Sequence, residues 1–431
     1  MSERMMERTG RMVARLSLAL AAGAATGCVN DLLEFDPGDR VESGSLDGPE
    51  SAELLVSSAV GDFECAFVQY IVTTSQVTDE MDNSNLSSTE AFQLDRRSVN
   101  KERTHYALFP CGTHEGLLTP IQTARFDADN ILAKLEGWTD DEVNPADPGR
   151  RTELIATAAA YAGYAYVLLG EGFCSATVDA GPELTQAEIL GLAEDRFTRA
   201  LAAADQAGDD DIRNLALVGR ARARLDLGRT AEAVADARLV AEGFEHFAHT
   251  SAASTRAYNS IYQFNGVGAL ITVGPAYLGL TFAGVPDPRV PVVDAGTTGS
   301  DQATPLRLQK KYTSLDQPIR MASYTEAQLI IAEVTGGTEA VNIINALHDA
   351  AGLPDFTSGD PAAIVAQVLQ ERSREFFLES QHFFDVKRLN LALNPAPGTP
   401  YAKGGNYGDM RCFPLPDVER DNNPNFSVAA R

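Results

Sequence analysis

The sequence predicts a mainly α-helical protein in which paired helices form a scaffold and irregular loops with short strands are inserted. Apolar residues recur at steps of four and three over long stretches, and glycines interrupt the pattern. The periodicity fades over residues 258–312, where Gly, Pro, Thr and Val become frequent. No composition boundary separates two cores, so we expect a single domain over residues 49–431.

The N-terminus predicts an exported chain with a lipid anchor. Residues 4–15 are rich in arginine, residues 16–25 are apolar, and small residues precede Cys28. A signal peptide that ends at a lipidation site has this order, so residues 1–27 should be removed and Cys28 acylated. Residues 28–48 are polar and acidic, which suits a tether. We expect no later stretch to be long and apolar enough to span a bilayer, which needs about 20 residues.

The body of the chain opens with two stretches of helical periodicity, residues 49–77 and residues 117–135. Residues 79–100, between them, are rich in Asp, Asn and Ser. We therefore expect two long helices joined by an irregular excursion.

Two helical pairs are predicted over residues 151–243. Helical periodicity runs up to Gly170 and again up to Gly228, and a second helical pattern follows each stretch. Thr185 and Glu188 form a capping box that opens the second helix of the first pair. We expect both glycines to end their helices, and the pairs resemble hairpins of the tetratricopeptide type.

The most informative stretch begins at Glu371 and reads ERSREFFLESQHFFDVKRL, which combines four acids and five bases with an amphipathic pattern. Glu371, Glu375 and Glu379 fall at i, i+4 and i+8, on one stripe of a helix. Arg372 and Arg374 are close enough in sequence to pair with Glu375 and Glu371. We expect a partly buried lattice of ion pairs beside an apolar face.

That stretch resembles the C-terminal signature of the SusD/RagB family, outer-membrane lipoproteins that capture nutrients for a TonB-dependent transporter. The residues that form this structural signature are Glu371, Arg372, Arg374, Glu375, Glu379, Asp385 and Arg388. Other landmarks resemble the family's in the same order: DPR at residues 287–289, KY at 311–312, ASYTEAQLIIAEV at 322–334 and CFPLP at 412–416. His348 and His382 stand where the family usually has Arg. The signature helices should cover about residues 323–389.

The resemblance implies a non-catalytic protein that binds a nutrient oligomer, an oligosaccharide or a peptide and most simply a glycan, and delivers it to a SusC-like TonB-dependent transporter. It implies a lipid-anchored position in the outer membrane, facing the cell surface, with no cofactor. Two alternative functions remain open beside this one. One is a tetratricopeptide-type envelope scaffold that mediates protein–protein interactions, and the other is a surface hydrolase with an unrecognised site.

Composition narrows the possible partners. Lys and Arg number 35 against 60 Asp and Glu, which gives a formal net charge of −25. Nucleic acid is therefore excluded as a partner, because phosphate binding needs clustered positive charge. An anionic ligand would be repelled unless a local basic pocket overcame this charge.

A search for catalytic and metal sites finds none. The GxSxG, GxxxxGK[ST] and HExxH motifs are absent from the sequence. Glu375 and Glu379 lie on adjacent turns of one expected helix, so they would not flank a sugar as a glycosidase pair does. His246 and His249 are spaced i, i+3, but we interpret them as ordinary surface residues rather than metal ligands.

The four cysteines after Cys28 suggest two disulfides in an oxidising compartment, with three possible connectivities. None has the CxxC spacing of a metal or redox motif. We favour Cys65 with Cys111, and Cys174 with Cys412.

Sugar or peptide capture needs aromatic faces beside polar side chains, and two loop regions offer both. The candidates in the first are Asp79, Glu80, Asn83, Asn85 and Phe92. The candidates in the second are Tyr258, Tyr262 and Phe264. Each ring could equally be part of the core. The first loop is rich in Asp but lacks the spacing of an EF-hand calcium loop.

Overall fold

The structure is a computed structural model that describes residues 48–86, 91–102, 105–112 and 116–426. The predicted signal peptide, the lipidation site Cys28 and the tether up to residue 47 lie outside the described residues. One compact unit covers Pro49–Arg431. Its buried apolar side chains form one contiguous core that draws on most of the helices.

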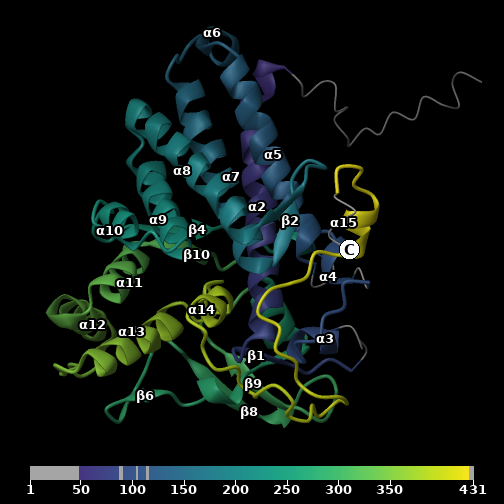
Figure 1. The fold of residues 1–431 in the computed structure, drawn as a ribbon, viewed down its shortest axis with the longest axis vertical. Coiled ribbons are helices and arrows are strands. Elements are labelled where there is room, and N and C mark those ends of the chain that lie inside the picture. Colours follow the sequence, from purple (N-terminus) through teal and green to yellow (C-terminus); the bar gives the residue numbers. More distant parts are fainter. Residues whose placement is uncertain (1–47, 87–90, 103–104, 113–115, 427–431) are drawn as a thin grey trace, which may run out of the picture. The chain divides into compact units, whose positions relative to one another are not determined.

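Three long helices lie at the centre of this unit: α2 (Ala52–Val77), α5 (Leu118–Gly137) and α7 (Arg150–Gly172). Figure 1 shows α2 running beside α5 and α7, and the three helices pack on one another. Helix α7 is rich in alanine, which allows neighbours to approach closely on several sides. Two helical stretches, α7 and Pro49–Val77, are long and apolar enough to cross a membrane, which corrects our expectation. Most of each is buried within the unit, as in core helices.

The two predicted helical pairs are present. Helix α7 pairs with α8 (Gln186–Ala207), and α9 (Asp210–Asp226) pairs with α10 (Thr230–Ala237). The capping box that opens α8 is formed as predicted. The prediction that Gly170 ends its helix is wrong, since α7 continues to Gly172. A Cβ at Gly170 would lie 2.9 Å from the Leu190 side chain, so this glycine permits close packing of α7 on α8.

Four further helices continue the scaffold from α10: α11 (Tyr324–Thr335), α12 (Gly337–Ala351), α13 (Pro361–Glu375) and α14 (His382–Arg388). The expectation that Glu371, Glu375 and Glu379 share one helical stripe is wrong, because α13 ends at Glu375. A turn with left-handed residues Leu378 (φ 56) and Ser380 (φ 81) follows. The turn lets three consecutive apolar side chains, residues 376–378, all become buried, whereas adjacent positions of one helix point in different directions.

Short strands form antiparallel pairs over the rest of the unit. The pairs are β1 (Met81–Asn83) with β5 (Ile271–Val273), β2 (Ser175–Thr177) with β3 (Glu183–Thr185), β4 (Glu245–Ala248) with β10 (Ile319–Ser323), β6 (Thr281–Phe282) with β7 (Val285–Pro286), and β8 (Val292–Thr298) with β9 (Pro305–Gln309). The remaining short helices are α3 (Ala91–Asp95), α4 (His105–Leu108), α6 (Asp140–Val143) and α15 (Asp417–Asp421), with a π-helical stretch at Tyr262–Val267. Residues 258–312 thus hold loops and short strands, as predicted.

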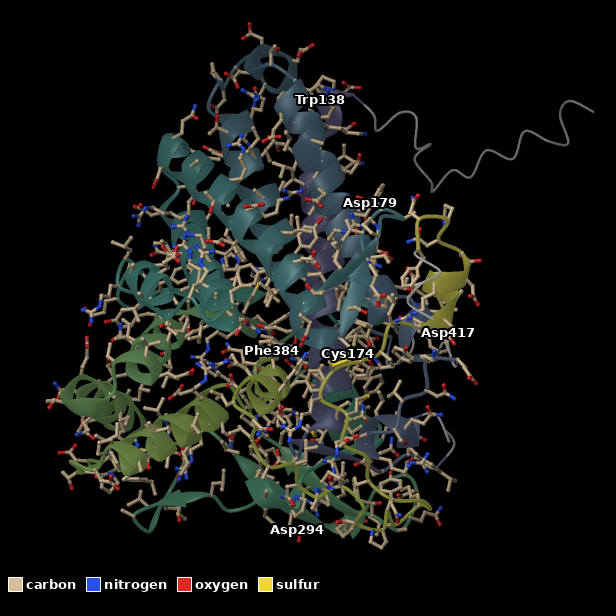
Figure 2. The ribbon with its side chains drawn as sticks, viewed as in Figure 1. Trp138, Cys174, Asp179, Asp294, Phe384 and Asp417 are labelled. Atoms are coloured by element: carbon tan, nitrogen blue, oxygen red, sulfur yellow. A yellow bond between two sulfur atoms is a disulfide. The ribbon has the colours of Figure 1, made fainter. Side chains whose placement is uncertain are left out.

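Two disulfides connect distant parts of the unit, Cys65–Cys111 and Cys174–Cys412. They are the two pairs that we favoured. Figure 1 shows the C-terminal segment passing β1 and β8 before it rises beside β2 to α15. Cys412 fastens this segment to the end of α7, where the labelled Cys174 lies (Figure 2).

Candidate functional site

The signature residues form a buried network of ion pairs, but not with the partners expected. Glu371 accepts hydrogen bonds from Arg289, His348 and Gln367, and its side chain has no exposed surface. Glu375 pairs with Arg289 at 3.0 Å. The DPR turn and the helix signature therefore meet in space, and His348 supplies a donor where the family usually has Arg.

The pairing predicted for the signature arginines is wrong. Arg372 bonds Asp385 at 2.8 Å, and Arg374 bonds Asp287 at 3.0 Å. Sequence spacing suggested partners on the same helix, but the turn after α13 brings α14 back against it. Burial opposes ionisation of Asp385, yet the charges of Arg372 and Arg388 outweigh it and hold the pKa of Asp385 at about 2.

Glu379 lies in the turn and reaches Lys311 at 2.7 Å and Arg320 at 3.0 Å. A pocket of about 460 Å³ is open above these groups. Three of the cationic side chains that line it, Arg289, Lys311 and Arg320, already bond to Glu375, Glu379 or backbone carbonyls, and the fourth, Lys310, is exposed. We therefore interpret this network as structural.

The candidates of the first loop divide into buried and exposed groups. Asp79 bonds His382 at 2.9 Å, and Glu80 is buried and accepts the backbone N–H of Leu378. Burial opposes the charge on His382, but the hydrogen bond to Asp79 and the charge of Glu80 raise its pKa to about 9. Both acids thus secure the turn of the signature to the end of α2.

Asn83 is buried in β1, where its backbone N–H donates to Asp95 and its side-chain carbonyl accepts from Asn85 and Lys403. Asn85 follows on the partly exposed edge, and Phe92 lies on α3 with its ring partly exposed. Of the first loop, Asn85 and Phe92 are therefore the candidates best placed to meet a ligand.

The candidates of the second loop do not form one cluster. Tyr258 lines a pocket of about 270 Å³ together with Glu64, His249 and Arg256. Tyr262 and Phe264 belong to the π-helical stretch and are partly buried against the core. Tyr258 therefore lines a recess against α2, while the other two rings mainly support the loops.

Strand pairing brings the first loop region beside segments near residues 269 and 301. Asn83 lies opposite Ile271 in the pair of β1 with β5. The hydroxyl of Ser84 donates to the carbonyl of Ala269, and the backbone N–H of Asp301 donates to the carbonyl of Ser84. Segments near residues 84, 269 and 301 therefore share one edge of the unit.

The C-terminal segment brings further aromatic rings to this edge. Tyr401 lies 6.4 Å from Phe92 and 5.2 Å from Tyr407, measured between ring centroids. Lys403 lies 4.9 Å from the centre of the Phe92 ring, and Arg97 lies 4.9 Å from that of Tyr407. We call Phe92, Tyr401 and Tyr407 the aromatic platform. Phe92 and Tyr407 are its partly exposed members.

Polar groups hold the platform in place. The hydroxyl of Tyr401 donates to Asp95 at 2.9 Å. Lys403 forms an ion pair with Asp301 at 2.9 Å and also donates to the backbone carbonyl of Asn83. Burial and the charge of Asp82 raise the pKa of Asp95 to about 7. We call the platform, together with Lys403, Arg96, Asn85 and Arg411, the loop face; Arg411 is included because its charge acts on Arg97, which lies against Tyr407.

Sequence reasoning missed Tyr401, Lys403 and Tyr407. They lie about 310 residues from Phe92, so no local pattern connects them. A usable signal was present, since two tyrosines and a lysine stand in a glycine-rich stretch with no helical period. Such a stretch exposes its rings unless another element covers them.

The other residues considered for chemistry have structural partners. His246 bonds the hydroxyl of Tyr161 at 3.1 Å and the carboxylate of Asp211 at 3.0 Å. Within the part of the chain that the structure describes, no group of three or more His, Cys, Asp or Glu residues is arranged to hold a metal ion.

Comparison with known proteins identifies the fold. Residues 319–426 match the model of the SusD family. A SusD superfamily protein from Bacteroides vulgatus is similar with a TM-score of 0.66 and 16% identity, over 88% of this chain and 99% of that chain. A SusD-like carbohydrate-binding protein from Bacteroides fragilis is similar with a TM-score of 0.64 and 14% identity, over 87% and 98%.

A laminarin-binding SusD-like protein is also similar, with a TM-score of 0.61 and 15% identity over 87% of this chain and 98% of that chain. No curated protein matches the chain. The described unit has the SusD fold, with its helical scaffold of the tetratricopeptide type. The resemblance to the SusD/RagB family that the sequence predicted is therefore confirmed.

Proposed function

We propose that this protein is a non-catalytic lipoprotein of the outer membrane that captures a nutrient oligosaccharide on its loop face and delivers it to a TonB-dependent transporter. The observation that carries the proposal is the aromatic platform, which joins distant segments of the chain at one exposed edge of a SusD fold.

The platform suits sugars because pyranose rings offer flat C–H faces and a periphery of hydroxyls. Flat apolar faces pack on aromatic rings, and the hydroxyls need donors and acceptors within reach. Arg97 is almost fully buried, so it supports the protein side of Tyr407 and leaves the other side of the ring for a ligand. Asn85 and Arg96 supply polar groups beside the rings, and Lys403 holds that edge in place through its bonds to Asn83 and Asp301. Two similar structures are described as carbohydrate-binding and laminarin-binding, which supports a glycan as the ligand.

The expected anchor supports the proposal of delivery to a transporter. Acylation of Cys28 would confine the protein to the membrane surface, and residues 28–48 would act as a tether. Tethering raises the effective concentration of the protein over a SusC-like transporter, so a weak contact can persist. Capture itself breaks no covalent bond. The energy of import would come from the transporter.

The first test measures binding to the platform. Calorimetric titration with gluco-, laminari- and galacturono-oligosaccharides should give a dissociation constant for at least one series. Phe92→Ala and Tyr407→Ala should each weaken that binding about tenfold, because each removes one stacking face worth about 1.4 kcal/mol. Phe126→Ala is the matched control, since this exposed ring lies on α5, outside the loop face.

The competing functions give different results. Release of new reducing ends from the bound sugar would establish a hydrolase. Mild-detergent purification from native membranes should recover a β-barrel transporter with the protein. Recovery of other envelope proteins, without sugar binding and without a transporter, would favour the tetratricopeptide-type scaffold instead.

A further inference from the structure

Arginine pairing distinguishes the loop face from the rest of the unit. Nearly all arginines that the structure describes form an ion pair with a carboxylate. Arg96, Arg97 and Arg411 are the exceptions among the described residues. In a chain with a net charge of −25, carboxylates are abundant. The lack of a carboxylate partner at these three described arginines therefore requires an explanation.

These arginines are held by neutral groups of the C-terminal segment instead. Arg96 donates to the carbonyl of Gly404 at 2.8 Å and to the hydroxyl of Ser98 at 2.9 Å. Arg411 donates to the carbonyl of Val386 at 2.6 Å. Carbonyl oxygens orient a guanidinium without neutralising its charge. Both side chains are partly exposed, so their remaining N–H groups can reach a ligand.

Arg97 adds a third positive charge on the buried side of the loop face. It donates to the carbonyls of Gly408 at 3.1 Å and Asn394 at 3.3 Å, and also to that of Pro395. It is almost fully buried and lines a recess of about 230 Å³ beside His382. Asp79 pairs with His382 in that recess, while Arg97 donates to backbone carbonyls.

The acids around the loop face do not cancel these charges. Asp301 is paired with Lys403, and Asp82 is paired with Arg307 at 2.9 Å. Asp95 lies underneath and is partly protonated at neutral pH, because burial raises its pKa to about 7. Asp409 is exposed two residues before Arg411 and adds one opposing charge. The local balance is therefore positive although the protein as a whole is strongly acidic.

We propose that the loop face selects an acidic oligosaccharide, whose carboxylate or sulfate groups pair with Arg96 and Arg411 while its sugar faces stack on Phe92 and Tyr407. This inference rests on the proposed capture function and names its substrate class. A guanidinium group can donate two parallel N–H bonds to two oxygens of a planar carboxylate or of a tetrahedral sulfate group. An uncompensated positive cluster would also attract such a ligand against the repulsion of the whole protein.

The test compares ligands that differ only in charge. Oligogalacturonides should bind about tenfold tighter than their methyl esters, which keep the same sugars without the negative charges. A sulfated gluco-oligosaccharide and its unsulfated parent form the second pair and distinguish sulfate from carboxylate as the preferred group. Raising the salt to about 0.5 M should reduce the preference, because it screens exposed charges.

Variants locate the preference on the protein. Arg96→Gln and Arg411→Gln should each weaken binding of the acidic ligand about fivefold and weaken binding of the methyl ester much less. Arg238→Gln is the matched control, because this exposed arginine pairs with Glu339 on another part of the scaffold. Melting temperatures show that the variants are folded.

Two results would overturn the inference. If methyl esters and unsulfated sugars bind as tightly as their charged counterparts, charge selection fails while sugar capture stands. If no member of either pair binds and the platform variants change nothing, the capture function fails with it.

Discussion

The signature network and the loop face use the same residue type, arginine, in opposite ways. In the network, Arg372 is buried, and its Nε and Nη2 groups each donate a hydrogen bond to the carboxylate of Asp385. On the loop face, Arg96 is partly exposed and bonds only a carbonyl and a hydroxyl. A paired guanidinium fixes one structure, whereas an unpaired one keeps charge available for a ligand. The partner of an arginine, more than its presence, therefore separates the scaffold from the surface that we propose for binding.

The largest expected effect is in the network. Glu371→Ala should lower the free energy of unfolding by about 3 to 5 kcal/mol, because it leaves Arg289 buried with one fewer partner and His348 without a carboxylate. Asp210→Ala, at an exposed acid on α9, is the control and should change stability by less than about 0.5 kcal/mol. Urea unfolding measures both. Equal losses in the two variants would mean that the network contributes no more than a surface charge.

A smaller effect should depend on pH beneath the loop face. The pKa of Asp95 is raised to about 7, so the folded protein holds a proton there that the unfolded chain releases near pH 4. The stability associated with this proton is complete below about pH 4 and is lost as pH rises toward about 7. Asp95→Asn cannot ionise and keeps an oxygen for Tyr401 and Asn83.

The variant should therefore gain about 2 to 3 kcal/mol of stability relative to the wild type between about pH 5 and about pH 8. Urea unfolding of both proteins at the two pH values measures the gain. A constant difference between them would show that Asp95 does not retain its proton in the folded state.

The smallest effect on stability should come from replacing an arginine that bonds no carboxylate. Arg411→Gln should cost less than about 1 kcal/mol of stability, since its guanidinium gives up a bond to one carbonyl. Arg388→Gln should cost about 3 kcal/mol or more, because Glu333 and Asp385 lose a buried partner. Thermal unfolding of the pair measures the contrast. Similar losses would remove the distinction between the two regions.

Local patterns predicted much of this fold. Periodicity located α2, α5 and the helical pairs, and a capping box located the start of α8. The break after α13 was missed, because Glu379 continues the helical spacing and only the burial of three successive apolar residues reveals the turn. The ion-pair partners were missed for the same reason, since they depend on how α14 returns to α13.

The candidate site was only partly predictable. Phe92 was named from a loop rich in polar residues, and that loop does reach an exposed edge. Glu80 and Asn83 have the side chains of a binding site, but tertiary contacts bury them. Tyr401 and Tyr407 come from the far end of the chain, and their place beside Phe92 follows from long-range pairing that no local rule contains.

The Cys174–Cys412 disulfide has a consequence for how tightly the loop face would hold the sugar that we propose as its ligand. It fixes the segment that carries Tyr401 and Tyr407 at one end, and α14 fixes it at the other. Backbone hydrogen bonds between Phe413 and Gly172 and between Cys174 and Phe413 reinforce the fixed end. The freedom of this segment is thus lost when the protein folds and not when a ligand arrives. Binding to a surface ordered in advance keeps more of the contact energy as affinity, so formation of this disulfide would prepare the platform for the capture that we propose.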